Sequence, residues 1–160
     1  MRQYLQVARP ITIRSIIGLL LLTACARGPT GVVVRDGTRF SSDAHVHGDS
    51  LVVTLTATNT VAVEISFGIG GGCPMLVRLF ADARQSASPV WDEGQWRTCV
   101  LSLRELNLLP RQSVTFQDVI PNAVLREANV RGRVYVSTIA QLEPPLPLNA
   151  GYVSLPPPSR

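Results

Sequence analysis

The feature that most constrains the fold is a strict alternation of side chains that begins at residue 51. Leu51, Val53, Leu55 and Ala57 alternate with Val52 and three threonines. Successive side chains of a β-strand point to opposite faces, so this period of two predicts a strand with one face in the core. Val134 and Val136 supply a second apolar stripe with the same spacing. Two such stripes are suited to two sheets that pack face to face.

Other short segments rich in β-branched residues continue this pattern and are separated by turn residues. We expect further strands at 31–35, 61–67, 75–81, 90–92, 98–103, 113–119, 133–140 and 150–155, with turns at 68–72, 82–89, 109–110 and 121–122. Helix formers are dense only at 102–109, which is the one helical suggestion in the sequence, although its apolar residues fall on several faces. Seven to nine strands at this spacing predict an all-β antiparallel sandwich, with a small barrel as the alternative.

The N-terminus has the composition of an export signal. Residues 1–14 contain three arginines and no acid, and the apolar run 15–22 is far shorter than the roughly 20 residues that a membrane-spanning helix needs. This order predicts a secretory signal peptide. Its end, Leu22-Thr-Ala-Cys25, resembles the lipobox of bacterial lipoproteins. The resemblance implies that residues 1–24 are removed and Cys25 is lipidated; the alternative is an uncleaved anchor.

This interpretation divides the chain into parts. Residues 1–24 form the signal peptide, 25–30 a lipidated tether, 31–155 the sandwich domain and 156–160 a disordered, proline-rich tail. The lipid makes the membrane a partner and places the domain at the cell envelope. Ala26 after the cysteine indicates the outer membrane in a cell that has two. Without the signal peptide the chain has 12 arginines and 11 acidic residues, a net charge of about +1. This charge gives no reason to expect a nucleic-acid partner.

Export also sets the redox environment of the two remaining cysteines. Cys73 and Cys99 form an even pair, which in an oxidising compartment predicts a disulfide. The bond would contribute about 3 kcal/mol through the unfolded state. A metal site is the poorer alternative, because neither cysteine has another cysteine or a histidine within four positions.

From about residue 51 to 155 the order of features resembles the BsuPI-type intracellular proteinase inhibitor domain, an immunoglobulin-like sandwich family. The matching features are 55–59, a strand that ends in Asn59, together with 61–67, 79–80, 89–92, 109–116 and 132–138. Two positions depart from the family pattern: Arg111 replaces a turn glycine, and Val134 replaces a tyrosine that is found one place later, at Tyr135. The resemblance implies an immunoglobulin-like fold and a protein-binding role.

The candidate contact residues are Trp91, Trp96 and Arg97, because exposed tryptophan and arginine carry most of the energy of protein interfaces. The alternative is that both tryptophans fill the core. A contact through these residues would make the domain a protein-binding module. A second hypothesis is a structural or accessory subunit of an envelope assembly whose edge strands pair with neighbours.

The sequence gives little support for a catalytic or metal-binding site. Asp43, His45, His47 and Asp49 would share one face of an extended segment and could bind copper or zinc, but their Gly-Ser surroundings favour a solvated loop or edge strand. The glycine run 68–72 lacks the ending of a phosphate-binding loop and is expected to be a turn or bulge. No nucleophile–base pattern occurs. We therefore expect no enzyme, no cofactor and no resident metal.

Overall fold

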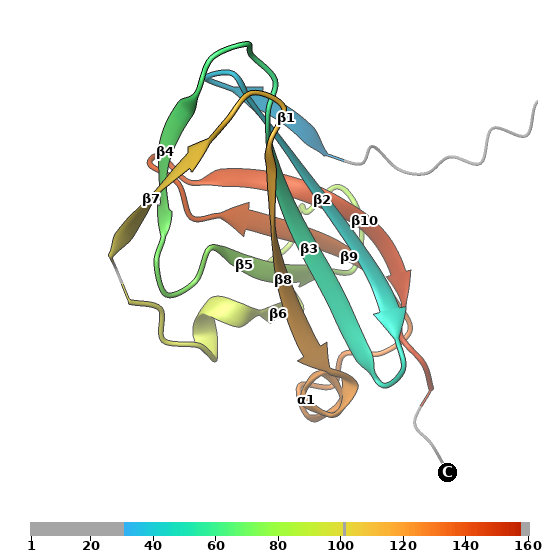
Figure 1. Cartoon of the computed structure of the whole chain (residues 1–160). Helices are drawn as coiled ribbons and strands as arrows, with labels where there is room; N and C mark the ends of the chain where they lie inside the picture. The colour runs from blue at the N-terminus through green and yellow to red at the C-terminus, as the bar shows by residue number, and fades with distance from the viewer. Residues whose placement is uncertain (1–30, 101, 158–160) are drawn as a thin grey trace, which may run out of the picture.

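The computed structural model describes residues 31–100 and 102–157, and these fold into a β-sandwich (Figure 1). The described part contains ten strands, one more than the upper number expected: β1 (Val32–Arg35), β2 (Thr38–His47), β3 (Ser50–Asn59), β4 (Ile65–Gly70), β5 (Met75–Phe80), β6 (Trp91–Asp92), β7 (Leu103–Leu108), β8 (Ser113–Pro121), β9 (Arg133–Ala140) and β10 (Leu146–Ser154). A 3₁₀ turn, η1 (Glu93–Gln95), follows β6, and a short helix, α1 (Asn122–Glu127), follows β8.

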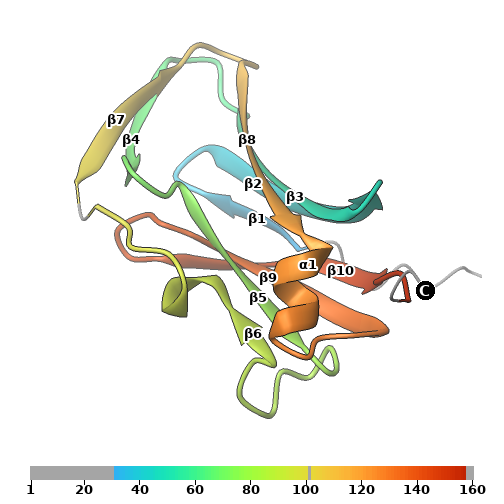
Figure 2. The ribbon, with the colours of Figure 1, turned by 90° about the horizontal axis from the view of Figure 1, so that it is seen from below.

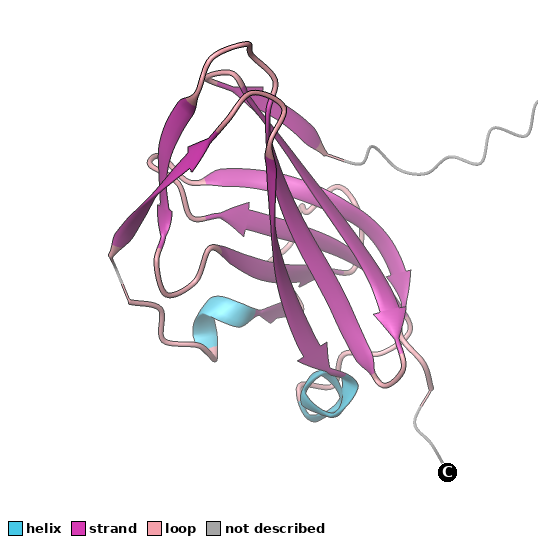
Figure 3. Ribbon diagram, in the orientation of Figure 1, coloured by secondary structure: helices cyan, strands magenta, loops and turns pink. Residues whose placement is uncertain are grey.

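The strands form three antiparallel sheets. The first sheet has the order β1-β2-β3-β8 and the second β10-β9-β5-β6. These two sheets are the layers of the sandwich, and Figure 2 shows the space between them from below. The third sheet pairs only β4 with β7 and stands at one side of the layers (Figures 2 and 3). The all-β antiparallel sandwich expected from the sequence is confirmed.

The core lies between the two layers and is built from the stripes that the sequence shows. Leu51, Val53, Leu55 and Ala57 of β3 are fully buried, as are Val77 and Leu79 of β5 and Val136 of β9. Val52 is buried too, so it departs from the outward face that strict alternation predicts. Burial of each large aliphatic side chain stabilises the fold by about 1.5–3 kcal/mol, which explains why the alternation predicts the layers well.

The local predictions fail where pairing over long distances decides the structure. Residues 102–109 do not form a helix; they contain β7, which pairs with β4 from Ile65↔Leu108 to Gly70↔Leu103. The strand expected at 98–103 is absent at 98–100, and β7 begins only at Leu103. The turn expected at 121–122 is the start of α1, whose Leu125 is 1% exposed and covers one end of the core.

Asn59 at the end of β3 sets the path of the following residues. Its side-chain nitrogen donates to the carbonyls of Val63 (2.7 Å) and Leu108 (2.9 Å), and its side-chain oxygen accepts from the Val61 backbone nitrogen (2.9 Å). These bonds hold residues 61–63 in a bend, so the strand expected at 61–67 begins only at Ile65 and continues through Gly70 as β4. The buried Asn59 amide thereby joins the first sheet to the β4–β7 sheet.

The N-terminal side of the domain is fixed at its first described residue. The Gly31 backbone nitrogen donates to the Asn149 carbonyl of β10 (2.8 Å), and a Cβ on Gly31 would lie 2.5 Å from the Asn149 backbone nitrogen. The signal peptide, Cys25, the tether and residues 158–160 of the tail lie outside the described residues. The two helical segments in the described ranges have six and three residues, too few to cross a bilayer.

Candidate functional site

The candidate site is the segment that runs from β6 through η1 to Val100. β6 is anchored on β5, where Trp91 pairs with Leu79 and Asp92 with Arg78. The Asp92 carboxylate accepts from Arg78 Nε at 2.9 Å through Oδ2 and from the Gly94 backbone nitrogen at 3.0 Å through Oδ1. The second contact is an N-cap, which starts η1 at this position.

Glu93, the first residue of η1, is a buried carboxylate beside β5. It is 5% exposed, and its Oε2 accepts from the backbone nitrogen of Val77 in β5 at 2.9 Å. Its Oε1 accepts from Arg97 Nη1 at 2.8 Å. Burial raises the pKa of Glu93 above the ordinary 4.5, and the nearby carboxyl group of Asp118 raises the pKa further. A buried carboxylate requires such partners, so Glu93 fixes η1 against β5.

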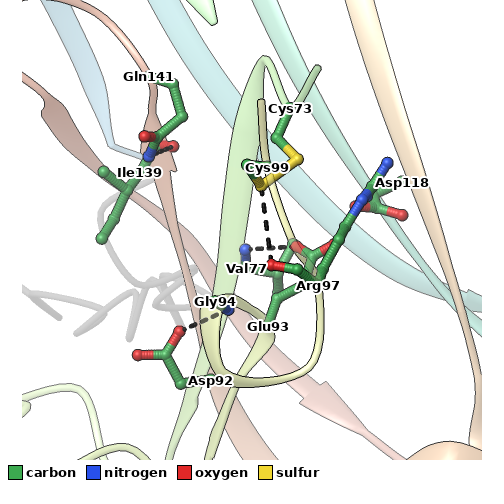
Figure 4. Close-up of a disulfide and its surroundings, with 10 residues drawn as sticks. All are labelled: Cys73, Val77, Asp92, Glu93, Gly94, Arg97, Cys99, Asp118, Ile139 and Gln141. Carbon is green, nitrogen blue, oxygen red and sulfur yellow. Dashed lines mark hydrogen bonds and ion pairs between the residues drawn. A yellow bond between two sulfur atoms is a disulfide. The ribbon is translucent and has the colours of Figure 1, made fainter. Parts of the chain in front are cut away.

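Arg97 connects this carboxylate to the opposite layer. The same Nη1 atom lies 2.8 Å from Glu93 Oε1 and 2.8 Å from Asp118 Oδ2 in β8. The hydrogen bond to Glu93 is the main cause of a raised Arg97 pKa, so the guanidinium stays charged. The network Glu93–Arg97–Asp118 therefore ties the candidate segment to both layers of the sandwich (Figure 4).

The predicted disulfide closes the other end of the segment. Cys73 and Cys99 are bonded, with their Cα atoms 5.5 Å apart, and Figure 4 shows the bond next to Arg97. Cys73 is 3% exposed and lies in the turn between β4 and β5. Residues 93–99 are thus held at the start by Glu93, in the middle by Arg97 and at the end by a covalent bond.

The two tryptophans have different positions, which corrects the contact surface expected from the sequence. Trp91 is 5% exposed and belongs to the core, so a partner cannot reach it. Trp96 is 66% exposed on the fixed segment, next to Arg97. The candidate surface is therefore reduced to Trp96 and Arg97. Val100, one residue after Cys99, is also largely exposed.

The histidine segment lies in β2 and provides no complete metal site in the described part of the chain. Asp43, His45 and His47 alternate on the exposed face of the strand, as an extended conformation predicts, and His45 Nδ1 lies 3.5 Å from Asp43 Oδ2. Asp49 departs from this face; it sits in the turn after β2 and binds Arg126 at 3.3 Å. No group of three or more potential ligands occurs among the described residues.

The glycine run is only partly a turn. Gly68 and Gly70 belong to β4, and the turn begins at Gly71. At Gly70 a Cβ would lie 2.6 Å from the Cys73 carbonyl oxygen, so glycine is required by the close approach of the β4–β5 turn. The turn or bulge expected at 68–72 is therefore found only from Gly71 onwards, and the strand within the run has no signal in the sequence.

Two residues of the site, Glu93 and Asp118, are not marked by any pattern in the sequence. Adjacent carboxylates such as Asp92 and Glu93 look solvated in a sequence, because charged residues are rarely buried. The one local signal is the spacing of Glu93 and Arg97, four positions apart. The partnership with Asp118 of β8 depends on the packing of the two layers and has no sequence signal.

Comparison with known proteins gives no family. No family description and no curated protein matches the sequence. Among solved structures, the chain is similar to a GH3 β-glucosidase of Bifidobacterium adolescentis (15% identity, TM-score 0.36) and to a β-glucosidase of Listeria innocua (14% identity, TM-score 0.36). Each likeness covers 72% of this chain and 16% of the glucosidase. The chain thus spans about one sixth of these enzymes, and the likeness is too distant to assign a family or an activity.

Proposed function

We propose that this chain is a lipid-tethered protein-binding module of the bacterial cell envelope. Acylated Cys25 would hold the domain at a membrane, and the domain would contact another protein through Trp96 and Arg97. A BsuPI-type proteinase inhibitor is the related function that the sequence resemblance suggests. The proposal is one of binding, and it assigns no reaction to the chain.

The observation that carries the binding role is the rigid presentation of an exposed tryptophan. Trp96 is 66% exposed, although the residues on both sides of it are fixed by Glu93, Arg97 and the disulfide. Because the backbone that carries Trp96 is already held in place, a partner that covers the side chain has less chain to order. Tryptophan and arginine are also the residues most enriched in binding hot spots. These features support a contact surface at this segment.

A photo-crosslinking experiment in cells tests the binding role. A photoreactive phenylalanine analogue at Trp96 is expected to give a discrete crosslinked protein, whereas the same analogue at Val34, 64% exposed on β1, serves as the matched control. Identification of the product by mass spectrometry then distinguishes two roles. A soluble protease favours inhibition, and a membrane complex favours an accessory subunit. Equal crosslinking at the two positions, or none at Trp96, would refute the Trp96 surface.

A labelling experiment tests the anchor separately. Cells supplied with radioactive or alkyne-tagged palmitate are expected to label the wild-type chain and not the C25S variant. Mass spectrometry of the purified protein is expected to show a mature chain that starts at acylated Cys25. An unmodified chain that starts at Met1 would contradict the anchor while leaving the crosslinking result interpretable.

A further inference from the structure

A groove lies along one edge of the β4–β7 sheet, away from the Trp96 surface. It has a volume of about 310 Å³, which falls at the lower end of ligand-binding pockets. One wall is β4 itself, from Ser66 to Gly68. The opposite wall comes from the β1–β2 turn and from the loop between β9 and β10, which contribute Arg35 and Glu143. Figure 1 shows β4 beside that loop.

The hydrogen-bond pattern of β4 identifies which backbone groups face this groove. Just beyond the strand, the Gly71 nitrogen donates to the Ser102 carbonyl at 2.7 Å, so the Gly71 N–H points towards the β7 side. The Gly70 nitrogen points the other way and donates to the Gln141 carbonyl at 2.8 Å. Peptide groups of an antiparallel strand alternate in this way. The N–H and C=O groups of Gly68 and Ser66 therefore also face away from β7.

The backbone groups of Ser66 and Gly68 that face away from β7 form a strand edge, and the chain segment after Gln141 does not continue along this edge. The Gly70–Gln141 bond begins a second ladder along β4, but the chain departs at Leu142 and Glu143. Arg35 holds the departing loop, because its Nη1 and Nη2 donate to the Pro144 and Glu143 carbonyls at 2.7 and 2.6 Å. None of the backbone hydrogen bonds found outside the ladders in the described ranges uses Ser66 or Gly68. The groove is the slot that another strand would fill.

The side chains around the slot define what would fit. Phe40 and Phe67 meet edge to face, with centroids 5.7 Å apart, and form an apolar floor. Leu103 forms a lip: its Cδ1 atom would lie 3.6 Å from a Cβ on Gly68. Two acidic residues, Asp36 and Glu143, also line the groove. Arg35 donates to the loop carbonyls and lies 3.5 Å from Asp36 Oδ2 through its Nε, so these two charges offset one another and Glu143 leaves the groove with a net negative charge.

We infer that the free edge of β4 binds an extended segment of another polypeptide by strand addition. The segment donates to and accepts from the backbone of Ser66 and Gly68, which continues the ladder that Gly70 and Gln141 begin. One apolar side chain of the segment packs on Phe40 and Phe67. A basic side chain beside it lies near Asp36 and Glu143. This site does not depend on the proposed lipid anchor or on Trp96.

Selection from a phage library of random heptapeptides on the purified protein tests the inference. Enriched sequences are expected to combine an apolar residue with a neighbouring lysine or arginine. A synthetic copy of the best peptide should shift the amide resonances of Ser66 and Gly68. A version N-methylated at its central backbone nitrogen, which keeps every side chain, should bind at least about tenfold more weakly, because it loses a hydrogen bond at the slot.

Variants of the protein separate this site from the Trp96 surface. G68P removes a donor that the β4–β7 ladder does not use, and proline is tolerated at such edge positions; binding should fall by about tenfold or more. The D36N/E143Q double variant keeps the backbone and should weaken selection of basic residues. W96A is the matched control and should bind the peptide like the wild type.

Three outcomes would overturn the inference. They are no enrichment over a carrier protein, peptides that bind G68P as well as the wild type, and peptides that lose affinity for W96A instead. Sedimentation velocity adds a fourth test. A wild-type dimer that becomes monomeric in G68P would identify a second copy of this chain as the occupant of the edge, and would refute a foreign segment.

Discussion

Trp91 and Trp96 lie five positions apart on either side of one 3₁₀ turn, yet the first is buried in the core and the second projects into solvent. The pairing of β6 with β5 turns Trp91 inward. η1 then reverses the chain, and the Glu93–Arg97 pair holds the reversal, so Trp96 is on the outside. The short turn thus separates a structural tryptophan from one available for binding.

Fluorescence should resolve this difference. In W91F, where only Trp96 remains, we expect red-shifted emission and strong quenching by acrylamide. In W96F the remaining Trp91 should emit at shorter wavelength and be shielded. The indole nitrogen of Trp91 has no hydrogen-bond partner among the described residues, so W91F breaks no such bond. Equal quenching constants in the two variants would contradict the placement of the tryptophans.

The disulfide should stabilise the domain measurably. It closes an interval of 26 residues, and loss of the bond in C73S/C99S should lower the free energy of unfolding by about 3 kcal/mol. Urea denaturation followed by circular dichroism measures this change. Reducing agent should lower the stability of the wild type to that of the variant and leave the variant unchanged. A wild type that is insensitive to reductant would indicate that the bond does not form.

Glu93 should give the stability a defined pH dependence. Its pKa in the folded state is raised above 4.5, so the folded protein binds this proton more tightly than the unfolded chain does. The resulting stabilisation is present below pH 4.5 and is lost as the pH rises through the folded-state pKa. The free energy of unfolding of the wild type should therefore fall relative to E93Q across that window.

Parallel urea titrations of the wild type and E93Q at a series of pH values provide the measurement. The difference between the two proteins removes the contribution of all other carboxylates, since these are present in both. A difference between the two proteins that is constant with pH, or that grows in favour of the wild type as the pH rises, would show that the Glu93 pKa is not raised.

Asn59 should be among the least replaceable polar residues. In N59D the side chain keeps its acceptor for Val61 but loses the donors to Val63 and Leu108 and buries a charge. We expect a loss of about 2–4 kcal/mol in the free energy of unfolding. The neighbouring T58A removes an exposed hydrogen bond to Ser113 and should cost less than about 1 kcal/mol. Equal losses would show that Asn59 does not join the sheets.

The contrast between β3 and β7 shows how far the sequence can predict this fold. The buried face of β3 can be predicted from its own residues, because every second side chain is apolar and is buried whichever strand pairs with β3. β7 has a leucine-rich sequence that suits a helix equally well, and its state depends on β4, more than thirty residues earlier. Strand propensity is weaker than the context that a partner provides. The helical suggestion at 102–109 is wrong for this reason.

One part of the candidate site, the disulfide, could be predicted from the sequence, whereas the positions of the two tryptophans could not. The pairing of Cys73 with Cys99 follows from their number and from the expected compartment, without knowledge of the fold. The burial of Trp91 and the exposure of Trp96 depend on a two-residue strand and a three-residue turn. Such short elements leave no periodic signal, so the sequence could name both tryptophans but could not choose between them.

The hydrogen bond from Gly31 to Asn149 has a consequence for how far the domain could stand from a bilayer. The bond makes Gly31 part of the folded body, so in the proposed lipoprotein only the peptide units from residue 25 to residue 31 would separate the body from the lipid. A fully stretched chain covers about 3.4 Å per residue, which limits this reach to about 20 Å. In the proposed lipoprotein, the domain therefore stays close to the headgroups, and a binding partner has to approach the membrane to meet it.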